Sequence, residues 1–482
     1  MKRITLHAVL LLLFASSVPA ADWPMWGNGS QRNMVNNVEE NIPVSWDADT
    51  GHNLKWTAKL GSQTYGNPVI SGGKIFVGTN NGGNHQPDVK GDKGVILCFS
   101  EVDGKFLWQM THDKLRAGRV NDWPQQGICS SPAIDGNRLY YVNNRCELVC
   151  ADTEGFRDGE NDGPYTDEQL TSEIDGDIVW KLDMLNELGA FPHNLATSSP
   201  TYDDDLIYVG TGNGVDEGHI VLPVPMAPSF IAVNKRTGKL VWESSAPGEN
   251  VLHGQWSSPA VGLIGGVKQV IFPGGDGKLY SFVAKTGEEL WSFDCNPTDS
   301  IWELGGMGTR NNIIATPVIY NDKVFIAVGQ DPEHGEGPGH LYAIDATKRG
   351  DITRSGVIWH NVDIMRSMTT VAIHDGILYT CDLGGIFRAV DVKSGKTLWT
   401  DDLLAAVWSS PMVVDGKVFM GDEDGDVIVY ATGREKKILF ETNMFNSIYT
   451  TPVAANGVLY ITNRRQLFAI AEGASSDTDE AK

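Results

Sequence analysis

Short apolar runs rich in β-branched and aromatic residues alternate with glycine turns along almost the whole chain. Lys74-Ile75-Phe76-Val77 and Arg138-Leu139-Tyr140-Tyr141-Val142 are two such runs. Their length and composition predict β-strands, and helical spacing of apolar residues is hard to find beyond the first 20 residues. The 54 glycines supply the tight turns that such strands need. The chain is therefore expected to be all-β.

The strand-like runs recur in one phrase that is repeated eight times. Two small residues and a proline open an apolar run, a glycine turn and a second run follow, and a turn and a tryptophan close the unit. Residues 257–291 and 369–399 are the fullest copies. Self-similarity at about 40 residues or more is typical of a β-propeller, here an eight-bladed one of four-stranded blades. The openings stand at Pro68, Pro132, Pro200, Pro259, Pro317, Val371, Pro411 and Pro452.

The two ends of the repeat region predict how the ring closes. Seven units end in a closing strand, but the eighth stops after 467–470 without one. An unassigned closing strand, 53–56 with Trp56, lies before the first opening. We expect this N-terminal strand to complete the last blade, because closure leaves no exposed edge. A linear array of repeats would leave Trp56 unexplained.

The sequence divides into three parts. Residues 1–20 are expected to be a signal peptide, with basic Lys2 and Arg3, an apolar stretch and a small-residue cleavage pattern. Residues 21–471 form the propeller, and the acidic tail 472–482 is expected to be disordered. The apolar stretch is shorter than the roughly 20 residues that span a bilayer. We expect an exported, soluble, periplasmic or extracellular protein, which is not a lipoprotein because no cysteine follows the cleavage site.

The charge limits the partners. The net charge is −23, which repels nucleic acid and anionic membranes. A protein or a small polar ligand is the expected partner. The six cysteines allow two interpretations in an exported chain. Cys98 and Cys150 occupy strand positions that Tyr280 and Tyr342 hold in later blades, which favours burial, whereas Cys129 or Cys146 could form a disulfide with another cysteine of the first two blades.

The units resemble the pyrroloquinoline-quinone (PQQ) repeat, the tryptophan-docking blade of quinoprotein dehydrogenases. The stretches 232–242 and 389–399 are close to its consensus, and Trp23-Pro24-Met25-Trp26-Gly27 with Arg32 resembles the start of such chains. The same repeat also builds cofactor-free scaffolds, including the propeller lipoprotein of the outer-membrane barrel-assembly machinery. The resemblance implies the fold, and it implies that the tryptophans dock one blade on the next, but it does not fix the function.

A quinoprotein site would need more than the fold. The family holds PQQ in the funnel with a calcium ion bound by a Glu and an Asn, an Asp base, a disulfide of adjacent cysteines and a tryptophan. Asn213 matches the asparagine by position, although it also suits a turn. The segment 249–256 lacks the expected aspartate, no two cysteines are adjacent, and the spacing of Glu147 does not fit. We expect a non-catalytic binding or scaffold protein of the cell envelope without a cofactor. A PQQ- and calcium-dependent dehydrogenase is the alternative, so enzymatic activity stays open.

An acidic insertion in the second blade is a candidate calcium loop. Asp158, Glu160 and Asp162 stand at places one, three and five, and Gly163 stands at place six, as in an EF-hand loop. Gln169 replaces the glutamate at place twelve. A solvated acidic loop is the other interpretation.

The loops before each opening and between the middle strands share one end of the ring and carry the candidate ligand-binding residues. Six residues before the opening, blades two to five offer amides or an imidazole, while blades six and seven offer apolar groups. Amides and imidazoles both donate and accept, which suits a neutral polar ligand or a peptide on the blade two-to-five side. Histidines in the middle loops, such as His219, His334 and His340, indicate a transition metal only weakly, because glycine-rich spacing fixes no geometry. The candidates are Gln126, His193, Asn194, Asn213, His253, Gln255, Trp256, Asn311, Asn312 and Arg366.

Overall fold

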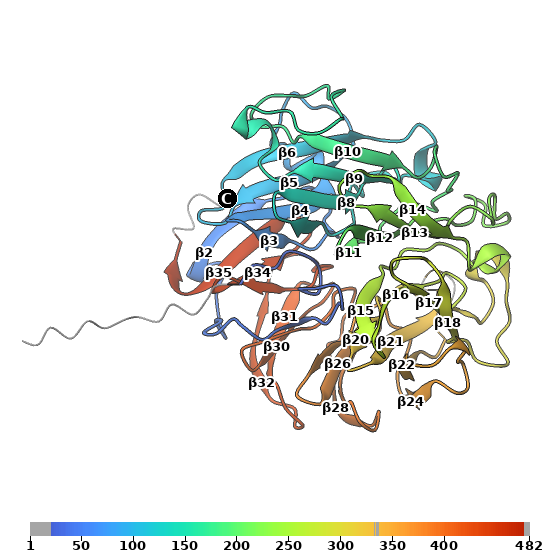
Figure 1. Ribbon diagram of the computed structural model, residues 1–482. Coiled ribbons are helices and arrows are strands. Elements are labelled where there is room, and N and C mark those ends of the chain that lie inside the picture. Colours follow the sequence, from blue (N-terminus) through green and yellow to red (C-terminus); the bar gives the residue numbers. More distant parts are fainter. Residues whose placement is uncertain (1–20, 332, 334–336, 477–482) are drawn as a thin grey trace, which may run out of the picture.

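The computed structural model describes residues 21–331, 333 and 337–476, and their strands form eight sheets arranged in a ring (Figure 1). Each sheet contains a four-stranded antiparallel meander. The first strands of neighbouring blades contact each other around the axis, as β3 contacts β7 and β11 contacts β15. The predicted eight-bladed propeller is confirmed, whereas the expected signal peptide 1–20 lies outside the described residues.

The blades follow chain order, each from its inner to its outer strand. The first four are β3 (Val69–Ser71), β4 (Lys74–Asn80), β5 (Lys93–Ser100), β6 (Phe106–Asp113); β7 (Ala133–Asp135), β8 (Arg138–Val142), β9 (Glu147–Asp152), β10 (Ile178–Asp183); β11 (Thr201–Asp203), β12 (Leu206–Gly210), β13 (Phe230–Asn234), β14 (Leu240–Ser244); and β15 (Ala260–Ile264), β16 (Val267–Pro273), β17 (Lys278–Val283), β18 (Glu289–Asp294). The last four are β20 (Val318–Tyr320), β21 (Lys323–Gln330), β22 (His340–Asp345), β24 (Val357–Asn361); β25 (Ala372–His374), β26 (Ile377–Cys381), β27 (Ile386–Asp391), β28 (Thr397–Asp402); β29 (Met412–Val414), β30 (Lys417–Gly421), β31 (Asp426–Ala431), β32 (Ile438–Asn443); and β33 (Val453–Ala455), β34 (Val458–Thr462), β35 (Gln466–Ser475), β2 (His52–Lys59).

Three two-residue strands extend these sheets: β1 (Val35–Asn36) beside β29, β19 (Asn311–Asn312) beside β21, and β23 (Gly350–Asp351) beside β18. The described residues contain no α-helix, and none of their helices is long and apolar enough to cross a membrane. Single turns of 3-10 helix lie in the loops: η1 (Asn81–Gly83), η2 (Gly118–Val120), η3 (Gly155–Asp158), η4 (Gly248–Asn250) and η5 (Leu304–Gly306).

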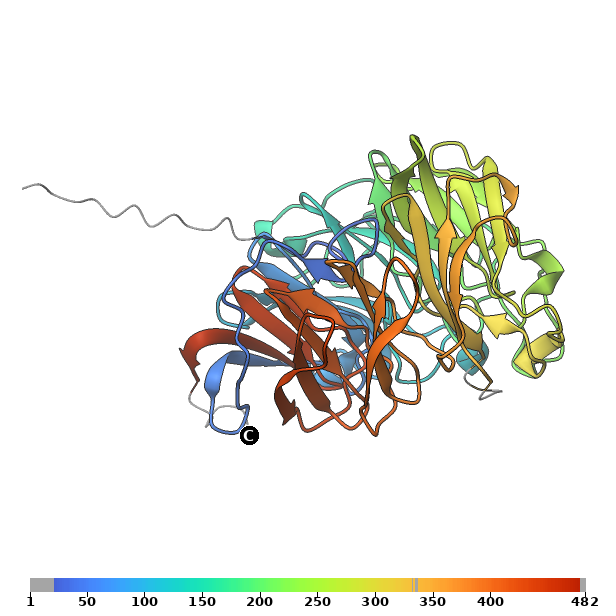
Figure 2. The same ribbon diagram turned by 90° about the horizontal axis from the view of Figure 1, so that it is seen from below.

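The N-terminal strand closes the ring as predicted. β2 pairs antiparallel with β35, with Leu54 opposite Ile470 and Trp56 opposite Ala469. Figure 2 shows blue β2 beside red β35. β35 runs to Ser475, so residues 472–475 continue the strand instead of starting the disordered tail. The register explains this extension, because His52 pairs with Ser475 and the Asn53 side chain accepts a hydrogen bond from the Gly473 amide (2.9 Å).

The tryptophans dock one blade on the next, as the repeat implied. Trp180 of the second blade donates its indole N–H to the Lys235 carbonyl of the third (3.1 Å). Its ring lies so close to Gly238 that a Cβ there would come within 2.6 Å of it, and Gly238 has a φ of 68°. Only glycine fits both requirements without strain. The same pairing joins Trp242 to Gly287, Trp359 to Gly395, and Trp56 to Gly104 across the closing seam.

The small residue before each opening position forms part of a hydrogen-bonded ring around the axis. The Ser131 hydroxyl accepts the Asn67 backbone N–H (3.0 Å), and the Ser199 hydroxyl accepts the Ser131 N–H (2.9 Å). A polar side chain at this place therefore ties neighbouring blades together at seven of the eight junctions, which explains why the repeat keeps one. In the described chain the link from Ser258 to Thr316 is missing, and Thr316 Oγ1 is buried without a partner. The other links are Ser199 to Ser258, Thr316 to Thr370, Thr370 to Ser410, Ser410 to Thr451, and Thr451 to Asn67.

The N-terminal segment 23–36 crosses the inner strands of all eight blades. Trp23 pairs with Ile70 in the first blade, and the Asn36 side chain donates to the Ala454 carbonyl in the last (2.9 Å). The intervening contacts are Pro24 to Ile134, Arg32 to Ser199, Ser30 to Val261, Gln31 to Ile319, Asn33 to Ile373, and Met34 to Val413. Seven of these eight partners stand two residues after the opening position, and Ser199 directly precedes Pro200. The segment therefore lies across the end of the channel opposite the rim loops.

Arg32 fixes this segment from inside the ring. Its side chain is fully buried and donates to the backbone carbonyls of Trp26 and Pro259 (both 2.9 Å), Ser199 (2.7 Å) and Pro200 (2.9 Å). Burial lowers the pKa of the guanidinium to about 9. The planar fork of arginine can reach several carbonyls at once, which the compact ammonium of lysine cannot do.

The cysteines belong to the core. All six lie within the described residues, and none forms a disulfide. Cys98 and Cys150 are buried, which confirms the interpretation as core residues. The disulfide hypothesis for Cys129 and Cys146 is wrong, because Cys146 is buried with its thiol directed at the Thr211 carbonyl (3.3 Å) and Cys129 lines the central cavity.

We predict that the free energy of unfolding decreases as the pH is lowered, because His112 takes up a proton in the unfolded chain but not in the folded one. This side chain is buried between the Tyr141 hydroxyl (2.8 Å) and the Asn143 amide (3.1 Å), and burial lowers its pKa to about 4. Below an ordinary pKa of about 6.5, the unfolded chain takes up a proton that the folded chain does not. The free energy of unfolding should therefore decline by up to about 3 kcal/mol as the pH falls from about 6.5 to about 4. His112→Gln should decline less over this window, and equal declines would contradict the assignment.

Candidate functional site

A cavity of about 810 Å³ lies at the centre of the ring and is lined by residues from all eight blades. Trp26 of the N-terminal segment lines it from one end, with its indole N–H 3.5 Å from the Thr451 hydroxyl. The opposite end lies among the rim loops. The cavity is therefore a funnel whose far end is covered by the N-terminal segment. Volumes of this size are typical of ligand sites.

The two sides of the funnel differ in chemistry. Blades one to four contribute mainly hydroxyls and amides, and blades five to eight contribute the apolar side chains Ile314, Met365, Met368, Leu383, Ala406, Trp408 and Tyr449. Met365 is 47% exposed and Trp408 is 41% exposed. Tyr449 stacks on Tyr65 at 4.9 Å and meets Trp408 edge-on at 6.0 Å. The charged lining residues are Glu333 and Arg366.

The structure divides the predicted ligand-binding residues into two groups. Gln126, Asn194, Trp256 and Arg366 line the funnel. The expectation that the others line it is wrong, because these side chains are buried in the wall: His193, Asn213, His253, Gln255, Asn311 and Asn312. Asn311 shows the reason. It belongs to β19, which pairs with β21, and its amide donates to the Cys295 carbonyl (2.8 Å).

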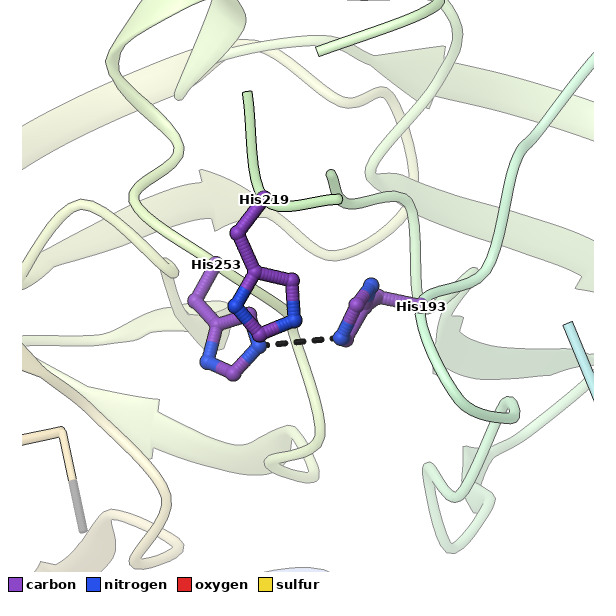
Figure 3. Close-up of side chains that lie close together, drawn as sticks. All are labelled: His193, His219 and His253. Carbon is purple, nitrogen blue, oxygen red and sulfur yellow. Dashed lines mark hydrogen bonds between the residues drawn. The ribbon is translucent and has the colours of Figure 1, made fainter. Parts of the chain in front are cut away.

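Three histidines converge in the wall of the funnel (Figure 3). The ring of His253 meets Trp256 edge-on, with the centroids 5.0 Å apart. His193 and His253 come from the rim loops of blades three and four, and His219 comes from the long loop between β12 and β13. One ring nitrogen of each lies within 4.8 Å of those of the other two, and His193 Nε2 and His253 Nε2 are 2.9 Å apart. His193 and His253 are buried, and His219 is half-buried. This is the group of potential metal ligands among the described residues.

The outer nitrogens of two of these rings are held by acceptors. His193 Nδ1 lies 2.8 Å from the Val215 carbonyl oxygen, and His253 Nδ1 lies 2.7 Å from Asp331 Oδ2. Burial, and then the charge of His253, lower the pKa of His193 to about 4, so its ring is neutral at pH 7. Burial alone would raise the pKa of Asp331, but the hydrogen bond and charge of His253 outweigh it and hold that pKa below its ordinary value.

Three amide side chains that were predicted to bind a ligand instead stabilise the loops that carry the histidines. Asn213 accepts the Phe191 N–H (3.0 Å) and donates to the Val224 carbonyl (3.0 Å). The Gln255 amide donates to the Asn213 carbonyl (2.9 Å), and the Asn312 amide donates to Asp331 (3.1 Å). These three side chains therefore hold the loops that carry the histidine cluster, and they do not face the funnel.

The insertion that carries His219 contains a turn held by hydrogen bonds to the side chain of Asp216. Asp216 Oδ1 accepts the N–H groups of Ile220 (2.9 Å) and Val221 (2.8 Å), and these backbone bonds lower its pKa. His219 has a left-handed φ of 57°, and a Cβ on Gly305 would come within 2.8 Å of His219. A left-handed φ at a residue other than glycine is strained and is often found at functional sites.

The sequence pattern indicates His219, but it does not predict that this side chain lies next to His193 and His253. The available signal was topological, since all three lie in loops at the same end of two adjacent blades. It also missed the role of Asp331, which was visible only as one member of a histidine-rich loop.

The acidic insertion in the second blade does not gather its carboxylates. Asp162 Oδ2 lies 2.8 Å from the Arg138 guanidinium, and Asp158 accepts the Glu160 N–H of its own loop (2.9 Å). Glu160 is exposed. This arrangement fits the solvated acidic loop better than a calcium site, because Asp162 is already paired with a cation.

The family model described as "Outer membrane protein assembly factor BamB" matches residues 166–401, 337–437 and 382–476, more than half of the chain. The chain belongs to this family. It is 22% identical over 408 residues to a BamB from Moranella endobia (strain PCIT), which covers 80% of this chain and 88% of that protein.

Enzymes carry the same fold. The chain is 23% identical over 393 residues to a polyvinylalcohol dehydrogenase from Pseudomonas sp, covering 76% of this chain and 52% of that enzyme. The quinohemoprotein alcohol dehydrogenase of Comamonas testosteroni superposes with a TM-score of 0.61 over 95% of this chain and 81% of that one, at 13% identity. At this identity the likeness shows the fold alone.

The residues present do not fit a calcium-bound quinone. Asn213, the match to the metal-binding asparagine, is fully buried and its amide is used by backbone groups. Asp331 is buried against His253, and the sequence has no adjacent cysteines to cover a quinone face. Glu333 is the one carboxylate among the residues that line the described funnel.

Proposed function

We propose that this chain is an exported, non-catalytic binding or scaffold protein of the cell envelope, which holds a segment of a partner protein in the funnel. The two-sided lining of the funnel carries this proposal. Exposed Trp408 and Met365 with Tyr65 and Tyr449 offer an aromatic and sulfur-rich surface, and such side chains are enriched where proteins bind each other. The amides and hydroxyls opposite can pair with the backbone of an extended segment.

Membership of a family described as an assembly factor supports this role. A net charge of −23 argues against nucleic acid and anionic membrane as partners. Residues 1–20 would direct export, and the mature chain would be periplasmic and unlipidated, since no cysteine follows the cleavage pattern.

The rival function, a PQQ- and calcium-dependent dehydrogenase, is tested by reconstitution. The mature chain is incubated with PQQ and calcium, freed of excess ligand, and examined for quinone absorbance and dye-linked oxidation of primary alcohols and polyvinyl alcohol. We expect neither stoichiometric quinone nor turnover, because the donor set for the calcium ion is not assembled. Bound quinone with turnover that Asn213→Ala abolishes would overturn the proposal.

A further inference from the structure

We propose that His193, His219 and His253 bind one divalent ion of the zinc type in the wall of the funnel. This inference goes beyond the proposed function and does not depend on it. It rests on the directions in which the three rings are held and on the distances between their nitrogens (Figure 3).

The hydrogen bonds of two rings aim their lone pairs at each other. A carbonyl oxygen and a carboxylate can only accept, so the Nδ1 atoms of His193 and His253 carry hydrogen. The Nε2 atoms are therefore the ring nitrogens left to bind an ion, and they lie 2.9 Å apart. Two lone pairs at this distance repel unless a cation lies beside them. A proton or a metal ion between the two nitrogens would remove this repulsion.

The third ring favours the metal ion. A proton can join only two nitrogens, but the half-buried His219 ring also faces the pair, with centroids 4.8 Å from His193 and 4.4 Å from His253. Zinc binds histidine nitrogen at about 2.0–2.1 Å, so nitrogens on one ion lie at most about 4.2 Å apart. The ligand atoms of the cluster already lie within 4.8 Å, and a small closing movement of the rings would bring them into range.

The surroundings match those of a zinc ligand set. Ligating histidines usually donate their second nitrogen to a carboxylate or a backbone carbonyl, as His253 and His193 do here. Three neutral nitrogens suit zinc better than calcium or magnesium, which prefer oxygen. Glu333 Oε2 lies 3.8 Å from His253 Nε2 and Glu333 lines the funnel, so the fourth position faces the cavity. A carboxylate or imidazole of a ligand in the funnel could occupy that position.

The test is zinc titration of the tag-free mature chain after chelator treatment, followed by calorimetry. We expect one zinc per chain and a higher melting temperature on binding. His219→Ala should weaken binding at least about 100-fold, because a ligand is lost. Asp331→Asn should weaken it about 10–100-fold, because the ligand His253 loses the carboxylate that orients its ring. His219 is half-buried, so its variant is expected to fold, as the melting temperature without zinc will report.

The matched control is His360→Ala. His340 Nδ1 and His360 Nε2 form another close pair at 3.0 Å, outside the cluster, and this variant should bind zinc like the parent. The proposal is overturned if the parent binds no zinc, if His219→Ala binds it equally well, or if His360→Ala removes the site. Should His219→Ala fail to fold, His219→Gln and Asp331→Asn carry the same comparison.

Discussion

Arg32→Ala should lower the free energy of unfolding by about 3–5 kcal/mol, as expected when a buried group with several partners is removed. The guanidinium donates to the Trp26 carbonyl within the N-terminal segment and joins that segment to blades three and four through the carbonyls of Ser199, Pro200 and Pro259. Without it, these buried oxygens lose a partner that water cannot easily replace. Denaturant unfolding followed by tryptophan fluorescence measures the change.

The control for this prediction is an exposed arginine. Arg434 is 60% exposed and forms an ion pair with Asp391 at 2.8 Å, so Arg434→Ala should cost no more than about 1 kcal/mol. If Arg32→Ala is as stable as Arg434→Ala, the N-terminal segment does not secure the ring.

Deletion of β2 should open the ring. The strand buries Leu54, Trp56 and Ala58, and burial of each large apolar side chain contributes about 1.5–3 kcal/mol. Its loss also frees the edge of β35, which can pair with another chain. We expect a melting temperature lower by roughly 10 °C or more and a shift to larger species in size-exclusion chromatography.

A milder variant separates closure from general damage. Trp56→Ala keeps the strand but removes the ring that packs on Gly104, at a cost of about 3–5 kcal/mol. Leu263→Ala, at a side chain that is 60% exposed, should be near neutral. A monomeric deletion variant with an unchanged melting temperature would refute closure by β2.

Most of the fold could be predicted from the repeated sequence unit. Each opening marks an inner strand, each tryptophan marks an outer one, and Trp56 was left without a blade of its own, so the ring and its seam could be predicted. The path of segment 23–36 could not, because it occurs once and its contacts are made with eight separate blades. Arg32 was recognisable only as part of a resemblance.

The site was predicted less well for a local reason. The rim loops were correctly selected, but strand alternation does not continue into them, so the direction of each side chain was not predictable. Asn194 lines the funnel with a left-handed φ of 62°, while His193 beside it turns into the wall. The turn set by Asp216 decides where His219 lies, and no repeat period encodes it.

The claim that the funnel holds a partner segment is central, and site-specific photo-cross-linking tests it most directly. A photoreactive phenylalanine derivative replaces Met365 inside the funnel or, as control, Val102, which is 73% exposed in the turn between β5 and β6. After irradiation of cells producing the full chain, adducts are identified by mass spectrometry. The account predicts a discrete adduct with an envelope protein from position 365 and none from position 102. Adducts from position 102 with none from position 365 would contradict it.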